Sequence, residues 1–148
     1  MDQRVSLITL GVDDLGRART FYEALGWHGQ QVEDTMFFQA GGLAIVLWGR
    51  SALADDAGVS DAGETPGFRS IALAHNVRSR EEVDQVIDQA EKAGARITRP
   101  AAETFYGGYA GYFSDLDGHL WEIAHNPGFT LTDDGALVLP DFGSSEAS

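Results

Sequence analysis

Cysteine and histidine, the side chains most typical of thiolate catalysis and transition-metal binding, number none and four in this sequence. Cysteine is absent, which excludes disulfides, thiolate nucleophiles and cysteine-bound zinc or iron–sulfur sites. Four histidines, a common type of metal ligand, stand at His28, His75, His119 and His125. Ser70 lies shortly before His75, but a catalytic triad is defined by geometry, so no Ser-His-Asp order is proposed.

Aromatic side chains form a second group that could bind a ligand. They are Trp48, Phe105, Tyr106, Tyr109 and Tyr112. Such rings bind flat ligands by stacking and cations by cation–π contact, although Trp48 and Tyr112 could instead pack in a core or a dimer interface. Residues 104–111 contain Gly107-Gly108 and are typical of a flexible loop that could cover a site. Neither a P-loop lysine nor a G-x-G-x-x-G pattern follows, so this loop is not a phosphate motif.

The charge balance restricts the partners. The 148 residues include 10 Lys and Arg against 23 Asp and Glu, a net charge of −13. This charge argues against nucleic acid and anionic membranes, and it favours a cationic ligand at long range. No apolar run approaches the roughly 20 residues that span a bilayer, and the N-terminus does not read as a signal peptide. We therefore expect one cytoplasmic domain.

The elements that must position these residues begin with a strand over residues 5–12. A helix follows, capped by Asp13 or Asp14 and ended by Gly26, with apolar residues at helical spacing. Three further strands are predicted at 27–33, 35–40 and 43–48. Residues 49–66 are acidic and contain Gly and Ala, so we expect a linker without helix or strand.

The same order of elements then returns. A strand is predicted over 68–74, and a helix begins at the capping pair Ser79 and Glu82 and ends at Gly94. Three strands follow at 95–100, 109–114 and 120–124. Residues 126–148 form an acidic tail whose end we expect to fray.

One unit of strand, helix and three strands therefore occurs twice. A helix covers one face of each four-stranded sheet, and the other face must be used because a bare apolar sheet face aggregates. Pairing the two units creates a trough between them. The predicted fold class is α+β, with two βαβββ modules in one domain over 1–148. The boundaries are module 1 at about 5–49, the linker at about 50–66, module 2 at about 67–125 and the tail at 126–148.

Several motifs carry a family resemblance. They are Leu10-Gly11-Val12-Asp13-Asp14-Leu15, Phe21-Tyr22, Leu25-Gly26, Ala93-Gly94-Ala95 and the run from Phe113 to Glu122. Over residues 5–127 the chain resembles the vicinal oxygen chelate superfamily, which includes glyoxalase I, bleomycin-resistance proteins and extradiol dioxygenases. The usual Asp-Pro-Asp-Gly of that family is here Asp115-Leu116-Asp117-Gly118. The resemblance implies the paired βαβββ fold and a homodimer, but it specifies function poorly because the fold hosts many chemistries.

Catalytic members of that superfamily hold a divalent ion in the trough with four side chains. The corresponding positions here are Leu7, Val46 (within one residue), Ser70 and Glu122. Only Glu122 could ligate a metal, and strand alternation places His75, His119 and His125 away from the trough. We therefore expect no metal cofactor; the alternative is a divalent metal held by other ligands.

The same alternation, with Glu122 placed in the trough by the family resemblance, and the aromatic residues expected near it together predict a ligand-binding lining. Its members are Leu7, Thr9, Val46, Trp48, Ser70, Ala72, Tyr109, Tyr112, Leu120 and Glu122. A mostly apolar lining with few polar groups is typical of a small-molecule site, and several small residues leave room for a ligand. The alternative is a closed core.

Glu122 is the candidate catalytic residue. Set among Leu7, Val46 and Leu120, its carboxyl would be desolvated and could exchange a proton near neutral pH, or pair with a cationic ligand. The alternative is a partly solvated carboxylate, or one tied to a Ser or Tyr hydroxyl.

Three functional hypotheses follow. The first is a homodimeric, bleomycin-resistance-like protein that binds a small organic ligand, cationic or aromatic, without a metal. The second is a glyoxalase-like lyase or isomerase, or a dioxygenase, that uses Glu122 as an acid–base group or metal ligand. The third is a domain whose trough is buried in a dimer and binds nothing.

Overall fold

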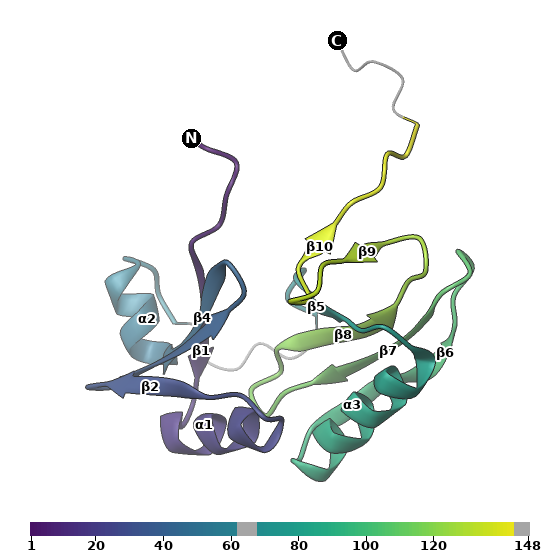
Figure 1. Ribbon diagram of the computed structural model, residues 1–148. Coiled ribbons are helices and arrows are strands. Elements are labelled where there is room, and N and C mark those ends of the chain that lie inside the picture. The colour runs from purple at the N-terminus through teal and green to yellow at the C-terminus, as the bar shows by residue number, and fades with distance from the viewer. Residues whose placement is uncertain (62–67, 144–148) are drawn as a thin grey trace.

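The computed structural model describes residues 1–61 and 68–143 and contains two four-stranded sheets (Figure 1). Module 1 comprises β1 (Leu7–Val12), α1 (Leu15–Ala24), β2 (Gly29–Val32), β3 (Thr35–Ala40) and β4 (Leu43–Gly49). Module 2 comprises β5 (Leu73–Asn76), α3 (Arg80–Lys92), β6 (Arg96–Glu103), β7 (Tyr109–Ser114) and β8 (Leu120–His125). The predicted α+β class with two βαβββ modules is confirmed.

Both sheets have the same topology. The strand orders are β1-β4-β3-β2 and β5-β8-β7-β6. In each module the first strand pairs in parallel with the last, and the remaining pairs are antiparallel. The chain therefore repeats one topology, as the order of predicted elements indicated.

The two long helices begin and end where the sequence predicts. The carboxylate of Asp14 accepts a 2.9 Å hydrogen bond from the backbone N–H of Arg17, and the hydroxyl of Ser79 accepts one of 3.2 Å from Glu82. Gly26 and Gly94 follow the helix ends with φ of 94° and 107°, values that only glycine adopts without strain.

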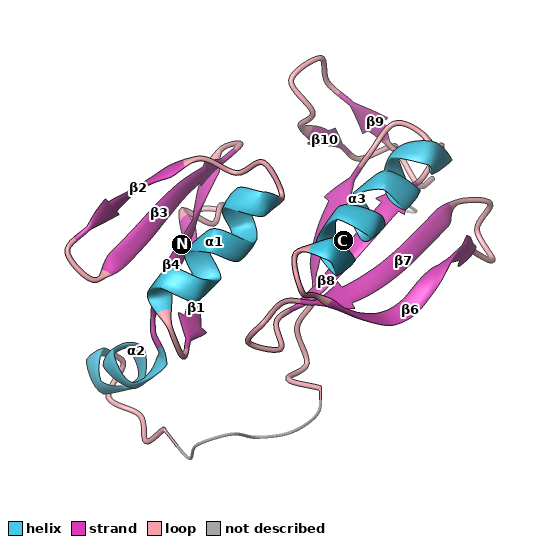
Figure 2. Cartoon of the chain, turned by 90° about the horizontal axis from the view of Figure 1, so that it is seen from below, coloured by secondary structure: helices cyan, strands magenta, loops and turns pink. Residues whose placement is uncertain are grey.

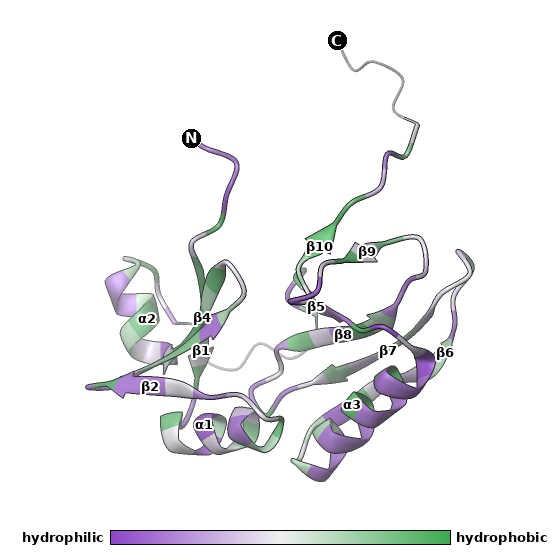
Figure 3. Ribbon diagram, in the orientation of Figure 1, coloured by the Kyte–Doolittle hydropathy of each residue, from purple (hydrophilic) through white to green (hydrophobic). Residues whose placement is uncertain are grey.

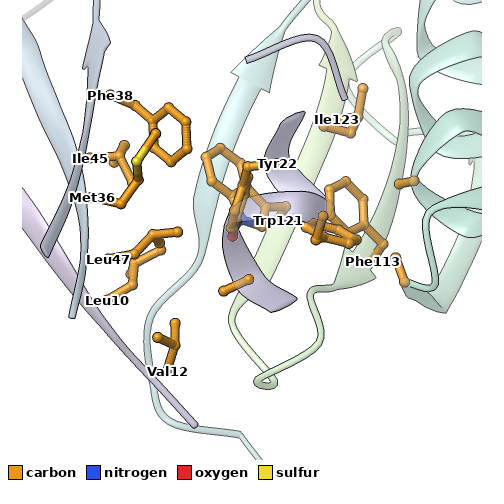
Figure 4. Close-up of a cluster of buried hydrophobic side chains, with 14 of the residues drawn as sticks. Leu10, Val12, Tyr22, Met36, Phe38, Ile45, Leu47, Phe113, Trp121 and Ile123 are labelled. Atoms are coloured by element: carbon orange, nitrogen blue, oxygen red, sulfur yellow. Dashed lines mark hydrogen bonds between the residues drawn. The ribbon is translucent and has the colours of Figure 1, made fainter. Parts of the chain in front are cut away.

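Helices α1 and α3 lie on the same side of the molecule, as the view from below shows (Figure 2). The buried face of α1 packs against both sheets. The Tyr22 ring lies 6.0 Å from that of Phe38 in module 1 and 6.2 Å from that of Trp121 in module 2. Figure 4 shows these side chains in one continuous core that joins the modules. The opposite surface of each sheet, which faces away from its helix, is called its open face below.

Several segments differ from the sequence prediction, and strand β6 continues to Glu103 instead of ending at residue 100. Residues Arg50–Asp56 form helix α2 at the start of the predicted linker, where Ala52, Leu53 and Ala54 favour helix. The rest of that predicted linker beyond Asp61 lies outside the described residues. Strand β5 begins at Leu73 rather than residue 68, because Ser70 has a φ of 63° and interrupts extended backbone.

The predicted tail contains a short hairpin of β9 (Thr130–Leu131) and β10 (Leu137–Val138). The guanidinium of Arg78 donates hydrogen bonds to the carbonyls of Leu131 and Thr132 and so ties this hairpin to module 2. Figure 3 shows β10 as hydrophobic and α3 as largely hydrophilic. The predicted fraying end falls on residues 144–148, outside the described part. Within the described residues, no helix is long and apolar enough to cross a membrane.

Candidate functional site

The open face of module 2 holds a row of cross-strand partners that includes Glu122. Ala74 on β5 pairs with Glu122 on β8, which pairs with Tyr112 on β7. Directly paired residues share a face of the sheet, so all three lie opposite the α3 side. The Tyr112 hydroxyl donates a 2.8 Å hydrogen bond to Oε2 of Glu122. Glu122 is thus partly buried and tied to a Tyr hydroxyl, rather than isolated among apolar groups.

The carboxylate further disfavours ionisation of its tyrosine partner. The hydrogen bond to Glu122 raises the pKa of Tyr112, and burial of the ring adds to this effect. Tyr112 is therefore a neutral hydrogen-bond donor at physiological pH. The pair presents one acidic oxygen and one protonated hydroxyl side by side.

The open face of module 1 carries the residues of this module that the sequence predicts to line the trough. Thr9 pairs with Val46. Leu7 lies two residues before Thr9 on β1, and Trp48 lies two residues after Val46 on β4, both on the same face. Val46 is 3% exposed, whereas Leu7 is 48% exposed and lies at the rim. The indole N–H of Trp48 donates a 3.2 Å hydrogen bond to Asp34, which holds the ring at the end of the sheet.

This face also contains a hollow that the sequence analysis missed. An open cavity of about 620 Å³ is lined by His28, Gly29, Gln30, Val32, Phe37, Phe38, Gln39 and Ala44. Phe37 pairs with Val46 and therefore shares its face. Phe37 and Gln39 alternate with buried residues in β3 and so share a face. This alternation was the sequence signal that could have identified the hollow.

Three predicted lining residues lie elsewhere. Tyr109 points to the helix side, where its hydroxyl donates a 2.7 Å hydrogen bond to Asp84 and its ring lies 5.3 Å below the guanidinium of Arg80. Ser70 and Ala72 are exposed and precede β5, so strand alternation does not apply to them. The remaining predicted lining residue, Leu120, is partly buried and shares the face of Glu122.

The histidines have structural neighbours. Nε2 of His119 lies 2.7 Å from the carbonyl oxygen of Gly11, and Nδ1 of His125 lies 3.3 Å from that of Val77. His75 borders a small cavity with Trp121 on the helix side, where loss of solvation lowers its pKa. No three Asp, Glu or His side chains come together as a potential metal site in residues 1–61 and 68–143.

The residues at the four positions implied by the family do not fit a divalent metal. These positions hold two aliphatic side chains, one exposed serine on irregular backbone and one carboxylate. Oε2 of that carboxylate, on Glu122, already accepts a hydrogen bond from Tyr112. Catalytic divalent sites normally use three or more protein ligands, so no chemical step is assigned to a metal here.

A further residue on this face was not predicted. The guanidinium of Arg99, on β6, lies 5.5 Å from the centroid of the Tyr112 ring. The register of β6 shifts on both sides of Arg99, so simple alternation along the strand could not place this side chain.

Comparison with known proteins identifies similar structures. A glyoxalase-related enzyme from Fulvimarina pelagi is 39% identical, with a TM-score of 0.85 over 93% of this chain and 98% of that one. Fosfomycin resistance protein FosX from Mesorhizobium loti is 22% identical, with a TM-score of 0.63 over 85% of this chain and 94% of that one.

A lactoylglutathione lyase from Agrobacterium tumefaciens is 18% identical, with a TM-score of 0.62 over 84% of this chain and 95% of that one. These last two likenesses, with FosX and the lyase, show the fold alone. The search of curated proteins gave no match. The family model described as the Glyoxalase/Bleomycin resistance protein/Dioxygenase superfamily matches residues 4–123. Together with the shared fold and the identity to the Fulvimarina protein, this match shows that the chain belongs to that superfamily.

Proposed function

We propose that the protein binds a small organic ligand, aromatic or cationic, in the trough between the open faces of its two sheets, without a catalytic metal. One observation carries this proposal. Of the four positions where the family holds a metal, only Glu122 has a ligating side chain, and its carboxylate is engaged by Tyr112. A carboxylate beside an aromatic ring suits an organic ligand better than a lone divalent ion.

The charge and the aromatic groups support a cationic or flat ligand. Glu122 supplies a negative charge on a partly buried surface, where its attraction for a cation is screened less than in bulk water. Tyr112 and Trp48 offer rings on the two open faces. The net charge of −13 attracts cations at long range.

The proposal includes a homodimer in the cytoplasm. Leu7, Ile71 and Phe68 expose 48%, 57% and 73% of their surfaces, Leu7 on the open face of module 1 and the other two in the segment before β5. A second copy that covers these side chains would remove apolar surface from water.

Acid–base catalysis is the second candidate, and the Tyr112–Glu122 hydrogen bond favours it. A carboxylate and a neutral hydroxyl at 2.8 Å can accept and return a proton, as a glyoxalase-like lyase or isomerase requires. The dioxygenase alternative depends on a bound metal, so elemental analysis of the purified protein tests it directly.

Isothermal titration calorimetry of metal-free protein tests the first candidate. We expect saturable binding for some members of a broad panel of aromatic and cationic compounds, benzyltrimethylammonium included. Glu122→Gln should weaken binding at least about tenfold, since a charged hydrogen bond or ion pair is lost. Glu103→Gln, which removes an exposed carboxylate on β6, should leave binding unchanged.

Several results would contradict this proposal. Failure of the whole panel to bind would refute ligand binding. Stoichiometric Ni, Zn, Fe or Mn that disappears in Glu122→Gln would refute the metal-free site. A substrate-dependent rate that is lost in Glu122→Gln while the substrate still binds would favour the acid–base enzyme.

A further inference from the structure

We infer that the ligand of the trough is amphoteric: Arg99 recognises its anionic group, and Glu122 recognises a cationic or hydrogen-bond-donating group across the ring of Tyr112. This inference rests on the proposed function and specifies the ligand class. It adds an anionic group to the proposed ligand, which the net negative charge of the protein would not suggest.

Three strands place these groups in one row. Arg99 on β6 is the direct partner of Tyr112 on β7, which is the direct partner of Glu122 on β8. Neighbouring strands lie about 4.8 Å apart, so the backbones of Arg99 and Glu122 are about 10 Å apart. The Tyr112 ring contacts both residues, through the cation–π contact with Arg99 and the hydrogen bond to Glu122.

An irregularity in β6 is what brings Arg99 to this face. Ile97 pairs with the buried Phe113 on the helix side, so strict alternation would direct Arg99 to the same side. The register shift between Ile97 and Arg99 places Thr98 as an extra residue and moves Arg99 opposite Tyr112. β-bulges commonly re-aim side chains beside functional sites.

The guanidinium of Arg99 is available to a ligand. It forms no ion pair with any residue of the described ranges, whereas Arg80 and Arg50 each lie 2.9 Å from a carboxylate. Arg17, Arg69, Arg78 and Arg96 also form no ion pair in the described ranges, so the contact with the Tyr112 ring beside Glu122 is what distinguishes Arg99. The cation–π contact holds the guanidinium near the Tyr112 ring, and its planar donors match a carboxylate or phosphonate in a bidentate geometry.

Charged residues on an edge strand can also serve only to prevent aggregation, and Arg96 provides the comparison. Arg96 lies on the same strand and the same face, opposite Ser114, and has no stacked ring. If both charges only protect the edge, substitution of Arg96 and of Arg99 should change ligand binding equally. If Arg99 recognises the ligand, only its substitution should weaken binding.

Calorimetric titration with matched probes tests this inference. The probes are para-aminomethyl derivatives of benzoic, phenylacetic and phenylpropionic acid, each as the free amphoteric acid, the methyl ester and the N-acetyl acid. We expect at least one free acid to bind about tenfold or more tightly than both of its blocked forms. Arg99→Gln should abolish its preference over the ester, and Glu122→Gln its preference over the N-acetyl acid. Arg96→Gln should change neither.

The outcomes separate this inference from the proposed function. If esters bind as tightly as free acids and Arg99→Gln has no effect, the amphoteric ligand is refuted while a cation-binding trough stands. Equal losses in Arg96→Gln and Arg99→Gln would also refute it, since the effect would then be general electrostatics. If no probe and no member of the earlier panel binds, both proposals fail. Circular dichroism of each variant confirms that it is folded.

Discussion

The hydroxyl of Tyr22, on α1 of module 1, donates a 2.5 Å hydrogen bond to Oδ2 of Asp115, directly after β7 of module 2. The indole N–H of Trp121 donates to the same hydroxyl at 3.1 Å. The other carboxylate oxygen of Asp115 accepts backbone N–H groups of Asp117 and His119 at 2.9 and 2.8 Å. Asp115 is 6% exposed, and this buried network joins the two modules. The Asp-x-Asp-Gly motif therefore has a structural role here.

Loss of this hydrogen bond should weaken the joint between the modules. Tyr22→Phe keeps the ring but leaves Oδ2 of Asp115 without its hydroxyl donor, so we expect the free energy of unfolding to fall by about 2 kcal/mol. Urea denaturation followed by tryptophan fluorescence measures this change. Tyr106→Phe, which alters a partly exposed tyrosine of the β6–β7 loop, should change the free energy of unfolding by less than about 0.5 kcal/mol. A Tyr22→Phe variant as stable as the wild type would show that the bond contributes nothing.

The same tyrosine predicts a sensitivity to alkaline pH. Burial, with the adjacent Asp115 charge, raises the pKa of Tyr22 well above its ordinary value of 10.0. The folded protein therefore keeps this proton above pH 10, whereas the unfolded chain loses it. Its contribution to stability is complete below about pH 10 and declines above that by up to about 1.4 kcal/mol per pH unit. Denaturation curves between pH 9 and 11 should show a shallower decline in Tyr22→Phe than in the wild type, and identical slopes would contradict this account.

The C-terminal hairpin should depend on Arg78. Its guanidinium donates to the carbonyls of Leu131 and Thr132, so Arg78→Ala removes the polar tether of β9 to module 2. We expect faster hydrogen exchange and faster proteolysis in residues 126–138, with little change in global stability, because the hairpin lies outside the main core. Arg96→Ala serves as a matched exposed control. Unchanged exchange in this segment would show that other contacts hold the hairpin.

Removal of divalent ions should leave the protein unaffected. Only one of the four family metal positions carries a ligating side chain, so dialysis against a chelator should not change the melting temperature by more than about 1 °C. Differential scanning calorimetry before and after dialysis measures this. A drop that is reversed by adding one transition metal would show that the ligand positions were assigned wrongly.

The sequence by itself determined the order of the elements, the cap of α3 and, between Asp13 and Asp14, the cap of α1. With Glu122 placed by the family resemblance, it also determined the faces of Val46, Leu120 and Tyr112. These features follow from local chemistry and from the two-residue repeat of a regular strand. The positions that it misjudged, Ser70, Ala72 and Tyr109, lie beside interruptions of that repeat. Ser70 adopts a left-handed backbone, and Tyr109 follows the turn with Gly107-Gly108, where no periodicity links its face to that of the preceding strand.

Tertiary structure alone decided the contacts that join distant segments. The bulge that turns Arg99 toward Tyr112 and the Tyr22–Asp115 hydrogen bond both depend on how β6, β7 and α1 pack together. An inserted residue in a strand has little local signature, because its energy is set by the partner strand and not by its own side chain. The secondary-structure elements could therefore be predicted from the sequence. The row of Arg99, Tyr112 and Glu122 across the open face could be identified only in the folded structure.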